Sequence, residues 1–261
     1  MNSISKKRLI DLLVFTLGII FVIILYQLFA WHQQNVAFNK ENMKIFLPNV
    51  NVIFKSLFKS LGRIKTYEAL FYTLLNLIIS ILIGGIFGIS LGLLAGNKRR
   101  IKLFLRPLIN LFKLTPVVVL VYILLVGLNN NRSIVPIATT MLIVMPIFYE
   151  GTVEGVESIS SDLIDVYKID SNFNFKVFKL VYIPSIIHFL KVSLFTAISF
   201  GLKVLISTEY LASKSNTFGS LMQASRASLR YSELYAYLII ILIVAFIFEL
   251  IPIIFKVSDD K

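Results

Sequence analysis

Six long runs of apolar residues constrain this chain more than any other feature of its sequence. They cover residues 9–31, 66–95, 105–128, 134–149, 187–210 and 234–255. A helix needs about 20 mostly apolar residues to cross the ~30 Å hydrocarbon core of a membrane, and only the fourth run is clearly shorter. Backbone groups in lipid must satisfy one another's hydrogen bonds, so helices are expected. The sequence therefore predicts an all-α, polytopic membrane protein with about six transmembrane helices.

The composition of the whole chain agrees with a surface that faces lipid. Of its 261 residues, 57% are hydrophobic and only 15% are charged, and the mean hydropathy is +0.84. A soluble domain carries charges on roughly a quarter of its residues. The formal net charge of +12 would favour nucleic acid in a soluble protein, but here the basic residues flank apolar runs. We expect the lipid bilayer as a partner and no nucleic acid.

Residue types needed for common catalytic and metal sites are missing or rare. The chain has no cysteine, which excludes disulfides, thiol catalysis and cysteine-ligated zinc. With only two histidines, His32 and His188, the sequence argues against a histidine metal site. The sequence contains no Gly-rich Walker motif and no Ser/His/Asp spacing suited to nucleophilic catalysis. We expect a non-catalytic chain with no cofactor and no bound metal.

Basic residues beside the apolar runs predict the orientation in the membrane. With a cytoplasmic N-terminus, fourteen Lys and Arg residues fall on the inner side and ten on the outer side. Because positive charge favours the cytoplasmic side, both termini are expected there. The first run is too long for a cleavable signal peptide and is expected to be retained. A segment that begins at Pro48 is predicted to be an amphipathic helix on the membrane surface, with a soluble docking helix as the alternative.

The polar segment from Glu150 to Pro184 interrupts two apolar runs. Ser161 is placed to cap a short helix with acidic residues in its first turn, and Ser171 is placed to end it. A second short amphipathic piece with interleaved Phe and Lys follows. Two such helices between membrane spans require a partner that covers their aromatic side chains. A loop folded back onto its own membrane domain is an equally simple alternative.

This segment resembles the EAA loop of the permease subunits of binding-protein-dependent ABC importers. That loop reads Glu-Ala-Ala, three residues, Gly, and then about a dozen residues to an apolar-Pro pair. Asp165, Val166 and Tyr167 stand at Glu-Ala-Ala, Ser171 stands at Gly, and Ile183-Pro184 matches the end. The spacing and the flanks match better than the Glu-Ala-Ala residues themselves.

The resemblance covers residues 67–255. Pro116 resembles the proline that opens the family's third span, and Gly88 to Gly96 followed by Lys98-Arg99-Arg100 resembles the end of its second span. The stretch from Gly201-Leu202-Lys203 to Thr208-Glu209-Tyr210, with Gly219 after it, resembles the fifth span of the nitrate, sulfonate, taurine and thiamine-precursor group. The ordered set of motifs is more specific than any one of them.

The resemblance implies the type I ABC importer permease fold in the cell membrane. Two permease copies would form the pathway as a homodimer, and a pair of cytosolic ATP-binding subunits would bind the loop and hydrolyse ATP. An extracytoplasmic substrate-binding protein or lipoprotein would deliver a small polar or anionic solute, such as a sulfonate, taurine, nitrate or the pyrimidine precursor of thiamine. The alternatives are a secondary transporter or channel without an ATPase partner, and a non-transporting scaffold.

On this interpretation the chain has three parts. Residues 1–65 hold the first helix and the amphipathic segment, residues 66–256 form the core permease domain with a coupling loop at 150–184, and residues 257–261 form a tail. The coupling residues, which would seat the loop in a groove of the ATPase, are Asp162, Leu163, Asp165, Val166, Tyr167, Ser171, Phe173 and Pro184.

Two charged residues in the fifth apolar run, Lys203 and Glu209, are the candidates for the translocation pathway or a gate. A charge at the bilayer centre costs at least ~2.5–3.5 kcal/mol and usually faces a cavity or a partner. Six residues of helix place the two about 120° apart, so each should have its own partner. A pathway role and an interhelix ion pair are both open for Lys203. Glu209 could gate the pathway, or could pair with Lys214 or Arg226.

Overall fold

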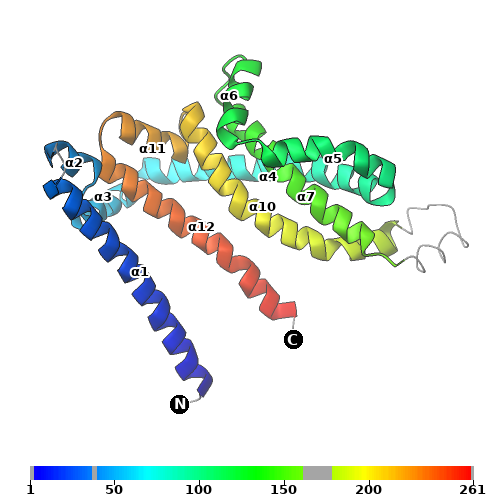
Figure 1. The fold of residues 1–261 in the computed structure, drawn as a ribbon, viewed down its shortest axis with the longest axis horizontal. Helices are drawn as coiled ribbons and strands as arrows, with labels where there is room; N and C mark the ends of the chain where they lie inside the picture. The colour runs from blue at the N-terminus through cyan, green and yellow to red at the C-terminus, as the bar shows by residue number, and fades with distance from the viewer. Residues whose placement is uncertain (1–2, 37–39, 161–177, 260–261) are drawn as a thin grey trace, which may run out of the picture. The chain divides into compact units, whose positions relative to one another are not determined.

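The computed structural model of the protein describes residues 3–36, 40–160 and 178–259 (Figure 1). The described residues form helices and no strand, which confirms the all-α fold expected from the apolar runs. With the labels of Figure 1, the helices are α1 (Ser3–Val36), α2 (Lys40–Phe46), α3 (Val50–Leu61), α4 (Ile64–Asn97), α5 (Arg99–Leu114), α6 (Val117–Gly127), α7 (Val135–Glu157), α10 (Ile183–Ala212), α11 (Phe218–Ala227) and α12 (Tyr231–Asp259). A π-helical turn, Phe178–Tyr182, leads directly into α10.

Five of these helices are long and apolar enough to cross a membrane: α1, α4, α7, α10 and α12. The third apolar run does not form the single straight helix that the sequence predicts. It is divided between α5 and α6, which are bent by 103° at Thr115 and Pro116. Proline has no N–H to continue the helix, and it disfavours helical backbone at the residue before it. Thr115 is accordingly extended, with ψ of 126°.

Glycines on one face of α4 bring this helix close to α7. Ideal Cβ atoms built on three of them would lie 2.6–2.7 Å from side-chain atoms of α7, in the pairs Gly84–Val144, Gly92–Thr152 and Gly96–Val156. Between these pairs, a Cβ atom on Gly88 would press against the carbonyl oxygen of Met145. The contacts advance together along both helices, so α4 and α7 run parallel. The stripe of small residues therefore serves close helix packing within the chain.

α10 packs against α7 in the opposite direction. Near the end of α7, Gly155 lies against Ile186 at the beginning of α10. Nearer the middle of α7, Val144 lies against Gly201, farther along α10. The two helices are therefore antiparallel, and the last residues of α7 lie beside the first residues of α10.

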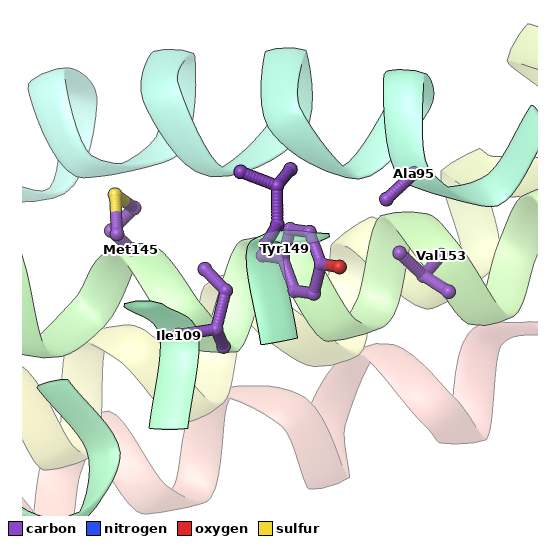
Figure 2. Packing of buried hydrophobic residues seen from close by; sticks show 6 residues of the cluster. Ala95, Ile109, Met145, Tyr149 and Val153 are labelled. Atoms are coloured by element: carbon purple, nitrogen blue, oxygen red, sulfur yellow. The ribbon is translucent and has the colours of Figure 1, made fainter. Parts of the chain in front are cut away.

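The parallel direction of α4 and α7 determines how the bent pair must run. Two spans of the same direction can be joined only by a segment that crosses back between them. α5 and α6 run antiparallel to α7. Lys102, near the start of α5, pairs with Glu157 at the end of α7, and Ile109, farther along α5, packs beside Tyr149 (Figure 2). α6 then packs against the beginning of α7. We therefore count α5 and α6 together as one broken crossing, the sixth in the described part of the chain.

The chain divides into two compact units, Met1–Ile64 with Ala224–Ile240 and Lys65–Gln223 with Ile241–Lys261. In the first unit, the hydroxyl of Tyr26 on α1 donates a hydrogen bond to the carbonyl oxygen of Pro48 at 2.8 Å. Arg63 forms an ion pair with Glu233 at 3.0 Å. α3 has the amphipathic character predicted for the segment after Pro48, since it buries Ile53 and Leu57. Its position on a membrane surface and the division of the chain into domains stay predictions.

Helices extend into both ends of the range 150–184, which polarity predicts to be a loop between two spans. α7 continues for two turns past Tyr149 and ends at Glu157. Its added turns bury Gly151, Val153 and Gly155, so packing extends the helix even though Glu150 breaks the apolar run. At the other end, α10 begins at Ile183, so Pro184 lies inside the helix.

Candidate functional site

A polar cluster centred on Glu209 joins the end of α10 to α4. The side chain of Glu209 is fully buried, with 0% exposure. Its carboxylate accepts hydrogen bonds from the hydroxyl of Thr73 at 2.7 Å, from the amide of Asn76 at 3.0 Å and from the backbone N–H of Gly219 at 3.4 Å. Burying a carboxylate is costly unless it is hydrogen-bonded, and these three donors compensate for the water that Glu209 loses on burial.

Lys214 belongs to the same cluster but reaches Glu209 through Asn76. Its ammonium donates a hydrogen bond to Oδ1 of Asn76 at 2.9 Å, while the amide nitrogen of Asn76 donates to Glu209. Burial lowers the pKa of the Lys214 ammonium from its ordinary value, and attraction to Glu209 opposes that change. Of the two partners proposed for Glu209 from the sequence, Lys214 thus lies within its cluster.

Directly after α10 the chain turns back, so that the start of α11 covers Glu209. Ser213 and Asn216 have φ of 53° and 57°, left-handed conformations suited to a tight turn. A Cβ atom on Gly219 would lie 2.6 Å from Cβ of Glu209, so no larger residue fits there without movement. The backbone N–H of Phe218 also donates to the hydroxyl of Thr73 at 2.9 Å. Both backbone and side chains therefore hold this turn against α4 and α10.

Lys203 has a different partner, in agreement with the 120° separation from Glu209 on the helix. Its ammonium lies 3.3 Å from Oε1 of Glu249 on α12. The side chains of Lys203 and Glu249 are 61% and 51% exposed in the isolated chain. The interhelix ion pair that the sequence left open is therefore present.

Most of the proposed coupling residues lie outside the described residues: Asp162, Leu163, Asp165, Val166, Tyr167, Ser171 and Phe173. Pro184 is described, and it occupies the first turn of α10 with its side chain exposed. Proline suits that position because a first-turn N–H has no partner within the helix. Close to it, the hydroxyl of Tyr182 donates a hydrogen bond to Asn97 at the end of α4. This hydrogen bond connects the start of α10 to α4, and the contact of Ile186 with Gly155 connects it to α7.

The sequence did not single out Thr73 and Asn76, the two side chains that hold Glu209. Both stand in a mostly apolar span, three residues apart and hence on the same face of the helix. Polar pairs at this spacing inside a membrane span need a buried partner, and this is the signal that could have found them. Which helix supplies that partner is a property of the fold.

One comparison with known proteins gives a match. Residues 84–261, more than half of the chain, match the family model of the binding-protein-dependent transport system inner membrane component. The match includes α7, α10, the segment between them and both Lys203 and Glu209. No curated protein matches the chain at a significant level.

Proposed function

The chain belongs to the family of inner membrane components of binding-protein-dependent transport systems, and on that premise we propose that it forms the translocation pathway of an ATP-driven importer. It is a multi-pass membrane protein and a transport component. In the proposal, two copies form a homodimer with cytoplasmic termini. A pair of cytosolic ATP-binding subunits drives it, and an extracytoplasmic substrate-binding protein or lipoprotein supplies the solute. ATP hydrolysis takes place on the partner, so this chain is not itself an enzyme.

The close packing of α7 is the observation that carries this proposal. α7 meets α4 on one side and α10 on the other at glycines, several of which leave no room for an added Cβ atom. Such contacts transmit displacement because packed interiors have little room to deform. The segment between α7 and α10, residues 158–182, joins two helices of this packed group. A subunit that moved this segment would therefore move the helices of the pathway with it.

The coupling role is tested by Tyr167→Asp in the complete importer, reconstituted in proteoliposomes with its ATP-binding subunits. A negative charge at an aromatic anchor should abolish both the stimulation of ATP hydrolysis and solute uptake. Asn174→Asp is the matched control, because it adds the same charge to the same segment at a position that matches none of the motif residues of the EAA resemblance. Full coupled transport by Tyr167→Asp, with normal amounts of protein in the membrane, would refute the assignment.

We propose separate roles for the two charged residues of α10. Lys203 lines the pathway and favours an anionic or strongly polar solute, which agrees with its accessible ammonium beside Glu249. Glu209 acts at the opposite end from the coupling segment, where it fixes the turn before α11 as part of an outer gate. The solute would be a sulfonate, taurine, nitrate or the pyrimidine precursor of thiamine, as the resemblance suggests. Binding measurements on the cognate substrate-binding protein would identify it.

A secondary transporter or channel without an ATPase partner is the alternative function. It would move solute along an existing gradient when the chain alone is placed in liposomes. The importer requires both the ATP-binding subunits and ATP, so the chain without them should show no solute uptake. Gradient-driven uptake by the chain alone would favour the alternative.

A further inference from the structure

A polar pocket of about 770 Å³ lies between α5 and α7, at the end of the bundle where α4 and α7 both terminate. Its volume falls within the range of ~300–1,000 Å³ that is typical of small-molecule sites. Six charged side chains of both signs line it: Arg99, Lys102, Arg106, Glu150, Glu154 and Glu157. None of these six is among the individual coupling or pathway residues named from the sequence.

Ion pairs within the chain neutralise only some of the charged side chains that line the pocket. Lys102 lies 2.7 Å from Glu157, and Lys113 beside the pocket holds Glu150. The remaining three, Arg99, Arg106 and Glu154, are exposed and form no ion pair with any residue in the described ranges. The pocket therefore offers two unpaired guanidinium groups and one unpaired carboxylate.

The hydroxyl group of a largely buried tyrosine adds a hydrogen-bond donor to the same pocket. Tyr149 lines it and is only 5% exposed, and its hydroxyl forms no hydrogen bond with a residue of the described part of the chain. Figure 2 shows its oxygen on the side of Ala95 and Val153, which also line the pocket. An acceptor bound beside the two arginines would satisfy this hydroxyl.

We propose that this pocket binds the headgroup of an aminophospholipid such as phosphatidylethanolamine. The phosphate accepts hydrogen bonds from Arg99, Arg106 and the hydroxyl of Tyr149, since charge-assisted contacts of this kind suit phosphate oxygens. The ammonium group pairs with Glu154. Basic pockets between transmembrane helices are recurrent lipid headgroup sites, and the carboxylate here selects a zwitterionic headgroup over an anionic one.

The apolar surroundings favour a lipid over a soluble phosphate compound. Leu103 lines the pocket and is 56% exposed, and the adjacent Phe104 is 81% exposed. Leu111 continues this apolar surface along α5. An acyl chain can lie against these side chains while the headgroup stays in the pocket. A free phosphate would use neither the apolar surface nor Glu154.

The test measures lipid binding to the purified full-length chain by native mass spectrometry, with equal amounts of phosphatidylethanolamine, phosphatidylcholine and phosphatidylglycerol. The wild-type chain should prefer phosphatidylethanolamine, whose primary ammonium can donate hydrogen bonds to Glu154. In Arg99→Gln/Arg106→Gln this binding should fall about tenfold, because two charge-assisted contacts are lost. Lys98→Gln/Arg100→Gln removes the same charge from residues outside the pocket wall and should bind as the wild type does.

Two further variants test the two ends of the headgroup separately. Glu154→Gln should lose the preference for phosphatidylethanolamine over phosphatidylglycerol, because the partner of the ammonium is gone. Tyr149→Phe should weaken binding of all three lipids by a smaller factor than the double arginine variant, because only one donor is removed. Both changes are conservative in size, and size-exclusion profiles check that the variants are folded.

Several outcomes would overturn the proposal. One is equal binding of the three lipids by the wild-type chain, and another is unchanged binding by Arg99→Gln/Arg106→Gln. Displacement of the lipid by millimolar inorganic phosphate would make this a soluble phosphate site. If the double arginine variant kept its lipid but lost the ATP-binding subunits, the pocket would instead be part of a subunit interface. The outcomes that concern lipid or phosphate binding do not bear on the transport function, which the uptake assays test independently.

Discussion

At the scale of single residues, Glu209 is the position with the strictest requirements. Its carboxylate has no exposure to solvent and is the acceptor for Thr73, Asn76 and the N–H of Gly219. These donors come from α4 and from the start of α11, so one side chain connects three segments. Leaving a buried donor unsatisfied costs about 1–3 kcal/mol, which makes the carboxylate important to all three segments.

We therefore expect Glu209→Ala to lower the free energy of unfolding by about 2–4 kcal/mol. Glu209→Gln keeps one acceptor oxygen and should fall between the wild type and Glu209→Ala. Thermal unfolding of the purified chain in detergent measures the change. Ser207→Ala is the control, because its exposed hydroxyl bonds only to the carbonyl of Lys203 in its own helix. If Glu209→Ala unfolds at the same temperature as this control, the cluster does not hold the segments together.

Lys203 allows its two proposed roles to be separated by exchanging charges. Lys203→Met removes the pathway charge and should reduce uptake of an anionic solute, with little loss of stability because the pair with Glu249 is half exposed. The exchange Lys203→Glu/Glu249→Lys restores the ion pair but moves the positive charge to α12. Uptake assays should show that the exchange does not recover transport. Full recovery would mean that only the ion pair matters, and unchanged uptake by Lys203→Met would exclude a pathway role.

At the scale of helices, the contact between α4 and α7 depends on the absence of side chains. Gly88 faces the backbone of α7 so closely that a Cβ atom would press on the carbonyl oxygen of Met145 and lie 2.7 Å from Cβ of Phe148. A backbone oxygen cannot rotate away as a side chain can. Any larger residue must therefore separate the helices or shift one along the other.

Gly88→Ala should accordingly destabilise the chain by about 1–3 kcal/mol, the usual cost of overpacking. Gly18→Ala is the matched control, because Gly18 lies in α1 with nothing within 4 Å of an added Cβ atom. In that position alanine should be neutral or slightly stabilising, since it favours helix over glycine. Unfolding temperatures in the same detergent compare the two. Equal effects of the two substitutions would show that α4 and α7 are not packed as described.

The apolar runs predict most of the helices but not where all of them break. Hydropathy averages over a window, so it joins residues 105–128 across Pro116, whereas the backbone chemistry of proline divides them into α5 and α6. It also ends the fourth run at Tyr149, although burial of Gly151 and Gly155 carries α7 to Glu157. The local sequence indicates which segments prefer to form helices. The ends of helices depend on what packs against them.

The candidate site was only partly predictable for a related reason. Lys203 and Glu209 stand out because charges are rare in membrane spans, and helical geometry correctly separates them. Their partners Glu249 and Thr73 lie 46 and 136 residues away along the chain, respectively. No local pattern relates such distant residues, because the order in which helices become neighbours is set by the packing of the whole bundle.

At the scale of the whole molecule, the relative directions of α4, α7 and α10 follow from the contacts between them. α4 and α7 are parallel and α10 is antiparallel to both, so the bent pair α5–α6 has to cross the membrane. Without the glycine contacts this pair could equally be a re-entrant segment, since a bend of 103° is compatible with a broken span and with a re-entrant loop. The location of the connections on either side therefore tests the arrangement.

The absence of cysteine makes this test direct, because each introduced cysteine is the only thiol. Ser133→Cys lies between α6 and α7, Ser158→Cys follows α7, and Lys98→Cys lies between α4 and α5. A membrane-impermeant maleimide added to whole cells should label only the first of these. The other two should react after the membrane is opened. If residues 98 and 133 are labelled from the same side, α5–α6 does not cross.

The four-residue glycine spacing on α4 also limits how the length of this chain can change. Positions 84, 88, 92 and 96 face positions 144, 148, 152 and 156, so the two rows keep one constant offset. Inserting or deleting a residue within either row would rotate the rest of that helix by about 100° around its axis. Larger side chains would then replace the small residues where the two helices touch. Length changes between residues 98 and 134 leave both rows intact. Related chains that differ in length should therefore differ outside the two rows, for example in that connection, while the paired rows keep the same number of residues.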